Sequence, residues 1–448
     1  MGRVRWFSAA RLEKQTAPDQ NAAGKRSAFR STWSTSAQRA ALPSDMRAPA
    51  HAALSSQHDR RLRILYSHRI LSKDGQGLHI DAIVAALQAE GHEVLVVGPG
   101  GYDGVTLGGE NRLLALLRRW MPPAVMELVE LAYSAPAYLK LARAAAAFRP
   151  DIIYERYNLF YIAGALLARR HRLPFLVEVN APLADERAQF GNLALHGLAR
   201  WSEAFVWRSA TNVLPVTEVL ARHVAAAEVP AERIVVISNG INPEEFSQAQ
   251  PSNAEEKPEL VLGFVGFVRP WHGVDAVVRA IADWRGQPRL SLVVVGEGSV
   301  RQELEELAAD LGVSEQVRFT GLADRQDVFR HIETFDIALQ PAAVAYACPL
   351  KILEYMAAGR AIVAPDQPNL RELLDNGRTA LLFDPTREPA GEAMRDAVQR
   401  LARDPALRAR LGAAAQAEIA RRDLTWVGNA RRIVGLARAE IARREIAP

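Results

Sequence analysis

Apolar and polar positions follow a regular pattern from residue 62 onward. The run LRILYSH (62–68) is short and apolar, as expected of a buried strand, and HIDAIVAALQAE (79–90) follows with apolar residues at helical spacing. Gly91 stands where a helix commonly ends, and the apolar run EVLVV (93–97) comes next. The pattern predicts a β-α-β unit.

The same alternation continues in two series that a polar stretch separates. Further strand-like runs of the first series are DIIYERY (151–157), PFLVEVNAP (174–182), NVLPVT (212–217) and RIVVISNG (233–240). Those of the second series are LVLGFVGFV (260–268), RLSLVVVGEG (289–298), QVRFTG (316–321), DIALQP (336–341) and AIVAP (361–365). Strands that alternate with helices form parallel sheets covered on both faces. We therefore expect an α/β protein with two tandem Rossmann-like, doubly wound domains that face each other across a cleft.

The changes in composition predict the domain boundaries. We expect a disordered basic extension (1–59), a first Rossmann-like domain (60–246), a linker (247–259), a second Rossmann-like domain (260–422) and a C-terminal helix that crosses back to the first domain (423–448). The extension holds nine Lys and Arg against four Asp and Glu and has no apolar period. It also fits a transit peptide, or a start upstream of the true initiator Met46.

Composition excludes several classes of protein. The chain has 448 residues, 49% hydrophobic and 24% charged, with a net charge of +4 and no long basic stripe, which argues against nucleic-acid binding. No apolar run is long enough to span a membrane. A single cysteine, Cys348, excludes an internal disulfide and fits a cytoplasmic location. The ten histidines show no metal-binding spacing, so no metal site is expected.

Dinucleotide-binding fingerprints are incomplete. KDGQGLHI contains Gly75 and Gly77 but lacks the third glycine, and VGEGSVRQEL offers only Gly296 and Gly298. No P-loop is present in the sequence. A dehydrogenase is therefore not supported.

Five motifs in order along the chain carry a resemblance to a known family. They are DGQGLHI (74–80), ISNGIN (237–242), GFVRPWHGVD (266–275), VRFTG (317–321) and CPLKILEYMAAGRAIVAP (348–365). Over roughly residues 62–435 the sequence resembles the GT-B glycosyltransferases, in particular glycosyltransferase family 4.

The resemblance implies a donor site in the second domain. Glu354 would accept hydrogen bonds from the ribose hydroxyls of a nucleotide sugar. Pro349 suits the first turn of the helix that carries Glu354, and free N–H groups at that helix start can bind a diphosphate. Three further residues are expected to bind the donor: Gly266, Gly321 and Leu350.

The predicted catalytic residues are two cations near the diphosphate, Arg269 and Lys351, and a second hydrogen-bond donor, His272. Arg269 would be the main clamp of the diphosphate through a rigid fork, with Lys351 and His272 beside it. Two positions depart from the family. Tyr346 replaces the glutamate that contacts the donor sugar but is still expected to bind the donor. Phe267 and His272 replace the usual Arg and Lys of the phosphate loop.

Acceptor contacts are expected in the first domain. The glycine-rich loop of Gly75, Gln76 and Gly77 would let backbone N–H groups approach the leaving phosphate or the acceptor. The other candidate cleft residues are His79, Glu155, Arg156, Glu178, Asn180 and, in the Asn-Gly signature, Asn239. None of them is identified as a general base.

The sequence thus predicts a retaining, metal-independent glycosyltransferase. It would need no cofactor, with a nucleotide-diphosphate sugar as co-substrate and a glycan or lipid-linked molecule as acceptor, and retention follows from the resemblance alone. Two alternatives stay open: a GT-B nucleotide-sugar epimerase, and a non-catalytic sugar-binding paralogue.

A segment at residues 110–142 suggests a membrane partner. Leu113, Leu117 and Trp120 fall at helical spacing beside several arginines, a composition typical of a helix that lies in the headgroup region. This reading predicts peripheral binding to an anionic cytoplasmic membrane surface. The other reading is a core helix that packs the same leucines.

Overall fold

The computed structural model describes residues 60–70, 75–99, 121–246, 249, 254–387 and 391–446. The predicted extension and the leucines and tryptophan of the proposed interfacial segment lie outside these ranges. Among the described helices, none combines the length and the apolar character needed to cross a bilayer.

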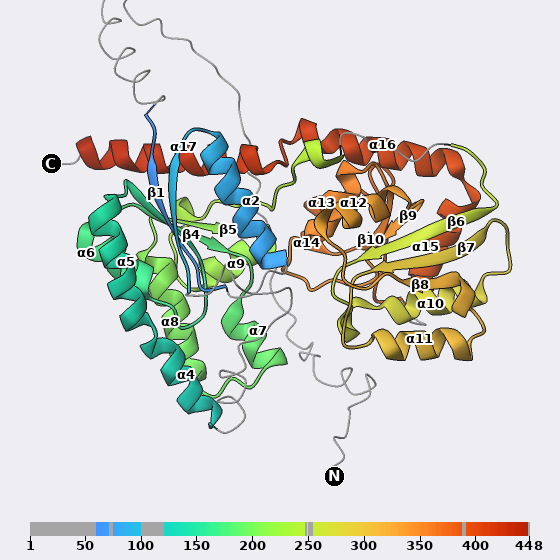
Figure 1. The fold of residues 1–448 in the computed structure, drawn as a ribbon, viewed down its shortest axis with the longest axis horizontal. Coiled ribbons are helices and arrows are strands. Elements are labelled where there is room, and N and C mark those ends of the chain that lie inside the picture. The colour runs from blue at the N-terminus through green and yellow to red at the C-terminus, as the bar shows by residue number, and fades with distance from the viewer. Residues whose placement is uncertain are drawn as a thin grey trace, which may run out of the picture. The chain divides into compact units, whose positions relative to one another are not determined.

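The first domain is built on a five-stranded parallel sheet with the order β2-β1-β3-β4-β5 (Figure 1). Its strands are β1 (Arg63–Ser67), β2 (Glu93–Val97), β3 (Ile152–Arg156), β4 (Phe175–Val179) and β5 (Asn212–Pro215). The helices around it are α2 (Gly75–Ala89), α4 (Pro123–Ala132), α5 (Ser134–Phe148), α6 (Ala163–His171), α7 (Leu183–Phe190), α8 (His196–Ser209) and α9 (Glu218–Ala226). Every residue of β3 and β4 is buried, as expected of central strands covered on both faces.

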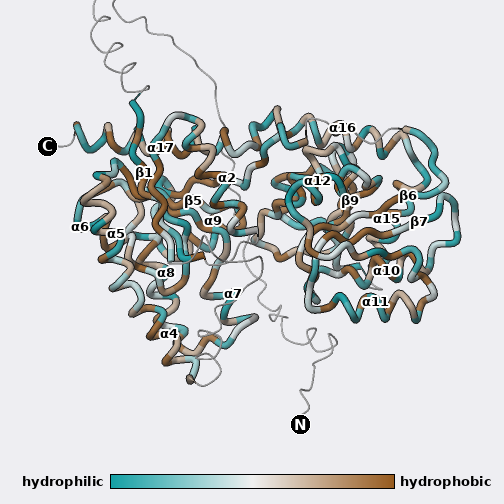
Figure 2. Tube along the Cα trace, viewed as in Figure 1, coloured by the Kyte–Doolittle hydropathy of each residue, from teal (hydrophilic) through white to brown (hydrophobic). Residues whose placement is uncertain are grey.

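The second domain is built on a six-stranded parallel sheet with the order β11-β10-β9-β6-β7-β8. Its strands are β6 (Glu259–Val265), β7 (Arg289–Val295), β8 (Val317–Phe319), β9 (Ile337–Leu339), β10 (Ala361–Pro365) and β11 (Leu381–Phe383). Its helices are α10 (Val274–Asp283), α11 (Arg301–Asp310), α12 (Arg325–Glu333), α13 (Leu350–Ala357), α14 (Pro368–Arg371), α15 (Glu392–Arg403) and α16 (Pro405–Arg421). Figure 2 shows the hydrophobic character concentrated on the strands and the helix faces that cover them.

The α/β architecture with two parallel sheets is confirmed, but two sequence predictions need correction. RIVVISNG (233–240) runs beside β5 without forming a strand: Val235 and Ile237 donate backbone hydrogen bonds to β5, yet only Ile234 forms a bridge. The cause is Pro215, which has no N–H to return the parallel ladder bond. The second correction is the expected loop at Gly75, which is the first turn of α2.

The C-terminal helix α17 (Trp426–Ile446) packs against α2 of the first domain (Figure 1). Trp426, Ala430 and Ile433 join Ile80 and Ile83 in one buried apolar cluster. The chain therefore returns to the first domain after completing the second sheet.

Candidate donor and acceptor site

Both sheets have a switch point where the strand order reverses, and these two points locate the site. The first lies between β1 and β3, and the second lies between β6 and β9. In open α/β sheets, ligands bind beyond the carboxyl ends of the strands at such points. Segments that follow these four strands should therefore form the binding site.

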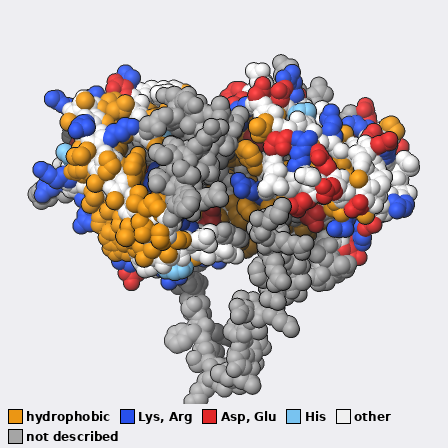
Figure 3. Space-filling view, turned by 60° about the horizontal axis from the view of Figure 1, so that its bottom comes forward, with side chains coloured by type: hydrophobic (Ala, Val, Ile, Leu, Met, Phe, Trp, Pro, Cys, Tyr) orange, Lys and Arg blue, Asp and Glu red, His pale blue; other side chains and the backbone are white. Residues whose placement is uncertain are grey.

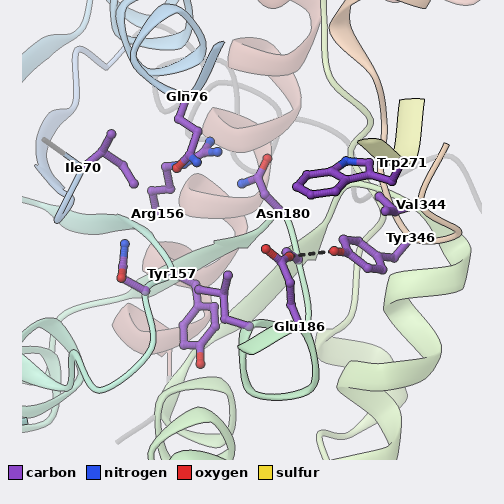
Figure 4. Close-up of a pocket in the computed structure, with 12 residues that line it drawn as sticks. Ile70, Gln76, Arg156, Tyr157, Asn180, Glu186, Trp271, Val344 and Tyr346 are labelled. Carbon is purple, nitrogen blue, oxygen red and sulfur yellow. Dashed lines mark hydrogen bonds between the residues drawn. The ribbon is translucent and has the colours of Figure 1, made fainter. Parts of the chain in front are cut away.

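A cavity of about 560 Å³ is lined by residues from these segments (Figure 4). Ile70 and Arg156 come from the β1 and β3 ends, and Trp271 and Tyr346 from the segments after β6 and β9. The remaining lining residues are Gln76, Tyr157, Asn158, Asn180, Ala181, Leu183, Glu186 and Val344. The volume suits a small ligand.

The loop after β6 lies directly against Lys351. Gly266 has a φ of 132°, and a Cβ there would lie 3.1 Å from the Lys351 amine. That amine lies 3.9 Å from the centre of the Phe264 ring, and burial lowers the pKa of Lys351 to about 7, with Glu354 partly opposing the shift. The absence of a side chain at Gly266 thus leaves room for the Lys351 amine beside the predicted phosphate loop.

His272 is a neutral imidazole in this loop. Its Nδ1 accepts the backbone N–H of Arg269 at 3.2 Å, which leaves the proton on Nε2. Burial, together with the nearby charges of Lys351 and Arg269, lowers the pKa of His272 to about 4. Arg269 is exposed, with its guanidinium 5.6 Å from the ring centre of Trp271. The three predicted catalytic residues therefore lie close together.

Glu354 is buried in α13, with 8% of its surface exposed. Burial raises its pKa, and Arg325 and Lys351 oppose that shift. The Arg325 guanidinium lies 3.6 Å from the carboxylate of Glu354 and also pairs with Glu245. Arg325 was not identified from the sequence. An arginine in the first turn of a helix is unfavourable beside the positive end of the helix dipole, and this could have indicated a binding role for Arg325 at the start of α12.

The remaining donor-side predictions lie around this helix. Pro349 is the N-cap of α13, and Leu350 is its first residue. Gly321 has a φ of 77°, and a Cβ there would lie 3.1 Å from a carboxylate oxygen of Glu297. Glycine is therefore required at this turn.

Comparison with known proteins identifies the family. Residues 245–418 match the family described as Glycosyl transferases group 1, and residues 74–240 match the Glycosyl transferase 4-like domain. The chain belongs to the GT-B glycosyltransferases of family 4. Each of the two sheets lies largely within one of the matched regions.

Similar GT-B proteins include named bacterial enzymes. The chain is 26% identical over 257 residues to an alpha-D-kanosaminyltransferase of Streptomyces kanamyceticus, covering 55% of this chain and 66% of that protein. It is 29% identical over 323 residues to a D-inositol 3-phosphate glycosyltransferase of Stackebrandtia nassauensis, covering 66% and 70%. The chain thus spans about two thirds of the length of these relatives.

Solved structures show the same fold. Anabaena HepE in complex with UDP has a TM-score of 0.64 at 20% identity, covering 84% of this chain and 99% of that one. Sucrose-phosphate synthase of Thermosynechococcus elongatus also has a TM-score of 0.64, at 18% identity, covering 86% and 100%.

In this GT-B chain, Glu178 is the centre of a buried network rather than a free acceptor contact. Its carboxylate binds His79 at 2.9 Å, Arg156 at 2.8 Å and the phenol of Tyr154 at 2.6 Å, and it also accepts from Asn180. Burial alone would raise the pKa of Glu178, but these partners lower it well below its usual range. Glu178 and His79 thus position Arg156 and Asn180, which line the cavity.

Glu155 must be removed from the acceptor candidates. Successive residues of a strand point to opposite faces, so Glu155 and Arg156 cannot both face the cavity. Glu155 is 0% exposed and accepts a hydrogen bond from the Ser67 hydroxyl at 3.0 Å. Burial raises its pKa to about 8.

The other first-domain candidates are divided between the cavity and its supports. Gln76 lines the cavity from the first turn of α2, whose glycines Gly75 and Gly77 are helical. Asn239 is buried, and its side-chain amide donates to the carbonyl of Cys348 at 2.7 Å. Asn239 therefore connects the end of the first domain to the segment before α13.

Tyr346, which departs from the family pattern, forms a side-chain hydrogen bond in the structure. Its phenol reaches Glu186 of α7, a residue that sequence reasoning missed. Trp271 was also missed, although it lies within a motif that the sequence had singled out. Within the described residues, no group of three or more His, Cys, Asp or Glu side chains is arranged to hold a metal ion.

Proposed function

We propose that the protein transfers a sugar from a nucleotide-diphosphate sugar to a glycan or lipid-linked acceptor, with retention of configuration. The observation that carries this proposal is the position of the Lys351 amine, which would lie 3.1 Å from a Cβ at Gly266, in the loop that also holds Arg269 and His272. It gathers diphosphate-binding groups next to Glu354, the proposed ribose acceptor. Anabaena HepE was solved with UDP and with UDP-glucose, so uridine donors are the first to test.

In sugar transfer, these groups would stabilise the phosphate that leaves with the nucleotide. As the bond to the sugar breaks, negative charge grows on the β-phosphate, and groups that meet this charge lower the barrier. Arg269 and Lys351 supply positive charge, and the start of α13 supplies backbone N–H groups. We propose that these groups suffice without a divalent ion.

A ligand-binding screen tests the donor assignment. Thermal shift with UDP, GDP and ADP and their sugars should raise the melting temperature for one nucleotide series, because a ligand of the folded state stabilises it. Sugar transfer or donor hydrolysis should then persist in excess EDTA. Loss of activity on chelation, restored by a divalent ion, would refute metal independence.

Activity assays with the donors found in this screen separate the alternatives. Sugar epimerisation without an acceptor would identify an epimerase. Donor binding without transfer, hydrolysis or epimerisation would identify a non-catalytic paralogue. Failure of every nucleotide to bind would contradict both the transferase and the epimerase.

An exposed apolar patch supports a membrane-proximal acceptor. Its residues are Val125, Leu128 and Val129 of α4, Leu139 of α5 and Leu166 of α6. In Figure 3, hydrophobic side chains gather broadly on the left of the view. Leu128 is 52% exposed, and apolar patches of this kind mark interaction surfaces.

Basic side chains accompany this patch. Exposed Lys140 and Arg143 lie on α5, and exposed Arg169 and Arg170 lie on α6. Apolar residues beside Lys and Arg are the composition of a surface that binds anionic lipid. We propose that the protein docks through this patch on the cytoplasmic face of a membrane and takes a lipid-linked acceptor there.

Liposome sedimentation tests the docking. The wild type should sediment with anionic vesicles and not with neutral ones, and Leu128→Glu with Val129→Glu should abolish sedimentation. The matched control is Leu311→Glu with Leu322→Glu, which places the same charges on exposed leucines of the second domain. Equal sedimentation of the patch variant and the control would contradict the docking.

A further inference from the structure

A hydrogen bond inside the cavity joins two segments that lie 160 residues apart. The phenol of Tyr346, in the segment between β9 and α13, donates to Oε2 of Glu186 in α7 at 2.7 Å (Figure 4). Burial and the nearby Glu186 raise the pKa of Tyr346, so the phenol keeps its proton at neutral pH and acts as the donor. Glu186 is thereby held in one orientation.

Two residues that line the cavity lie close in the sequence to the residues of the proposed diphosphate site. Trp271 lies two residues after Arg269, and Tyr346 lies three residues before Pro349, where α13 begins. Both side chains line the cavity. A sugar joined to a diphosphate at these two segments would therefore extend between Trp271 and Tyr346.

Glu186 offers this space a hydrogen-bond acceptor. A carboxylate accepts on both oxygens, and the Tyr346 phenol occupies only Oε2. Within the described residues, no side-chain partner for Oε1 is found. Glu178, by contrast, is fully engaged with its own network. Glu186 is therefore the lining carboxylate with capacity left for a ligand hydroxyl.

We propose that Glu186 binds a hydroxyl of the donor sugar and that Tyr346 is a positioning residue that holds Glu186 in place. This rests on the proposed function, because it requires a nucleotide sugar in the cavity. It places a determinant of sugar specificity in the first domain, in a helix outside the five sequence motifs.

Binding of nucleotide and nucleotide sugar by the same variants tests the proposal. The reference is whichever of UDP, GDP or ADP the wild type binds, together with its tightest-binding hexose conjugate, both measured by calorimetry. Glu186→Gln should weaken the nucleotide sugar about tenfold or more while changing the free nucleotide by less than about twofold, since only the sugar contacts the carboxylate.

Tyr346→Phe should give a smaller loss, again confined to the sugar conjugate. The double variant should bind no more weakly than Glu186→Gln, because both changes act through one carboxylate. The matched control is Asp185→Asn, an exposed carboxylate in the same helix, which should leave both affinities unchanged.

Other results would overturn the proposal. Equal loss of nucleotide and nucleotide-sugar affinity in Glu186→Gln would assign the hydrogen bond to holding the two domains together. Unchanged sugar affinity would also exclude the contact. Failure of the wild type to bind any of the three nucleotides would instead overturn the proposed function itself.

Discussion

The two sides of the cavity use their charged residues differently. On the second-domain side, Arg269 is exposed, and the Lys351 amine, whose pKa is about 7, lies beside Gly266. We propose that both groups have capacity left for a ligand. On the first-domain side, the carboxylate of Glu178 is already hydrogen-bonded to four side chains. Polar residues at the ends of strands can therefore either bind a ligand or support the groups that bind it. The burial of a residue and the number of its side-chain partners distinguish these two roles.

The largest expected effect is on the supporting side. Glu178→Ala leaves Arg156 buried without its partner, which should lower the free energy of unfolding by about 3 to 5 kcal/mol. Chemical denaturation measures this loss. The control is Glu93→Ala, whose surface pairs with Arg61 and Arg63 should contribute less than about 1 kcal/mol. Equal losses in the two variants would show that the network does not support the fold.

The next effect is on the binding side. Glu354→Ala should weaken binding of the nucleotide by about 1.5 to 3 kcal/mol, the range for hydrogen bonds to a charged group. The fold should persist. Calorimetry measures the affinity, and the change should be seen with the nucleoside diphosphate as well as with its sugar. An unaltered affinity would remove Glu354 from the ribose site.

A smaller effect concerns pH. Because the pKa of Lys351 is about 7, the amine is half neutral at that pH, and a bound diphosphate would draw a proton onto it. Affinity for the nucleoside diphosphate should therefore fall as pH rises from 7 to 8, by at most about 1 kcal/mol. Lys351→Met should flatten this dependence. A wild-type affinity that stays constant over this range would contradict the role of Lys351.

The smallest functional effect is expected at Glu155, which faces away from the cavity. Its pKa is raised to about 8, so the folded protein binds more protons than the unfolded chain between pH 4.5 and 8 and loses stability as pH rises through that range. Glu155→Gln removes this dependence. Its melting temperature should exceed that of the wild type more at pH 8 than at pH 5, with nucleotide affinity unchanged. A loss of affinity would return Glu155 to the site.

By itself, the sequence determined the architecture and located the residues that we propose for the donor side. Strands of a parallel sheet are buried on both faces and therefore appear as short apolar runs between helical segments. Such runs can be recognised from neighbouring residues alone. The motifs that carry Gly266, Arg269, Lys351 and Glu354 are also short, and they place these residues in the segment after β6 or within α13. Such positions can be read without knowing what lies across the cavity.

Only the tertiary structure decided which carboxylates were free. Glu155, Glu178 and Glu186 look equally available in the sequence. In the structure, Glu155 is fully buried, Glu178 is engaged in its buried network, and Glu186 accepts a hydrogen bond from Tyr346 across the cavity. Arg325 was likewise revealed only by its approach to Glu354. Burial and pairing depend on residues far apart in the chain, so the free energy that sets each role is not encoded in any local stretch.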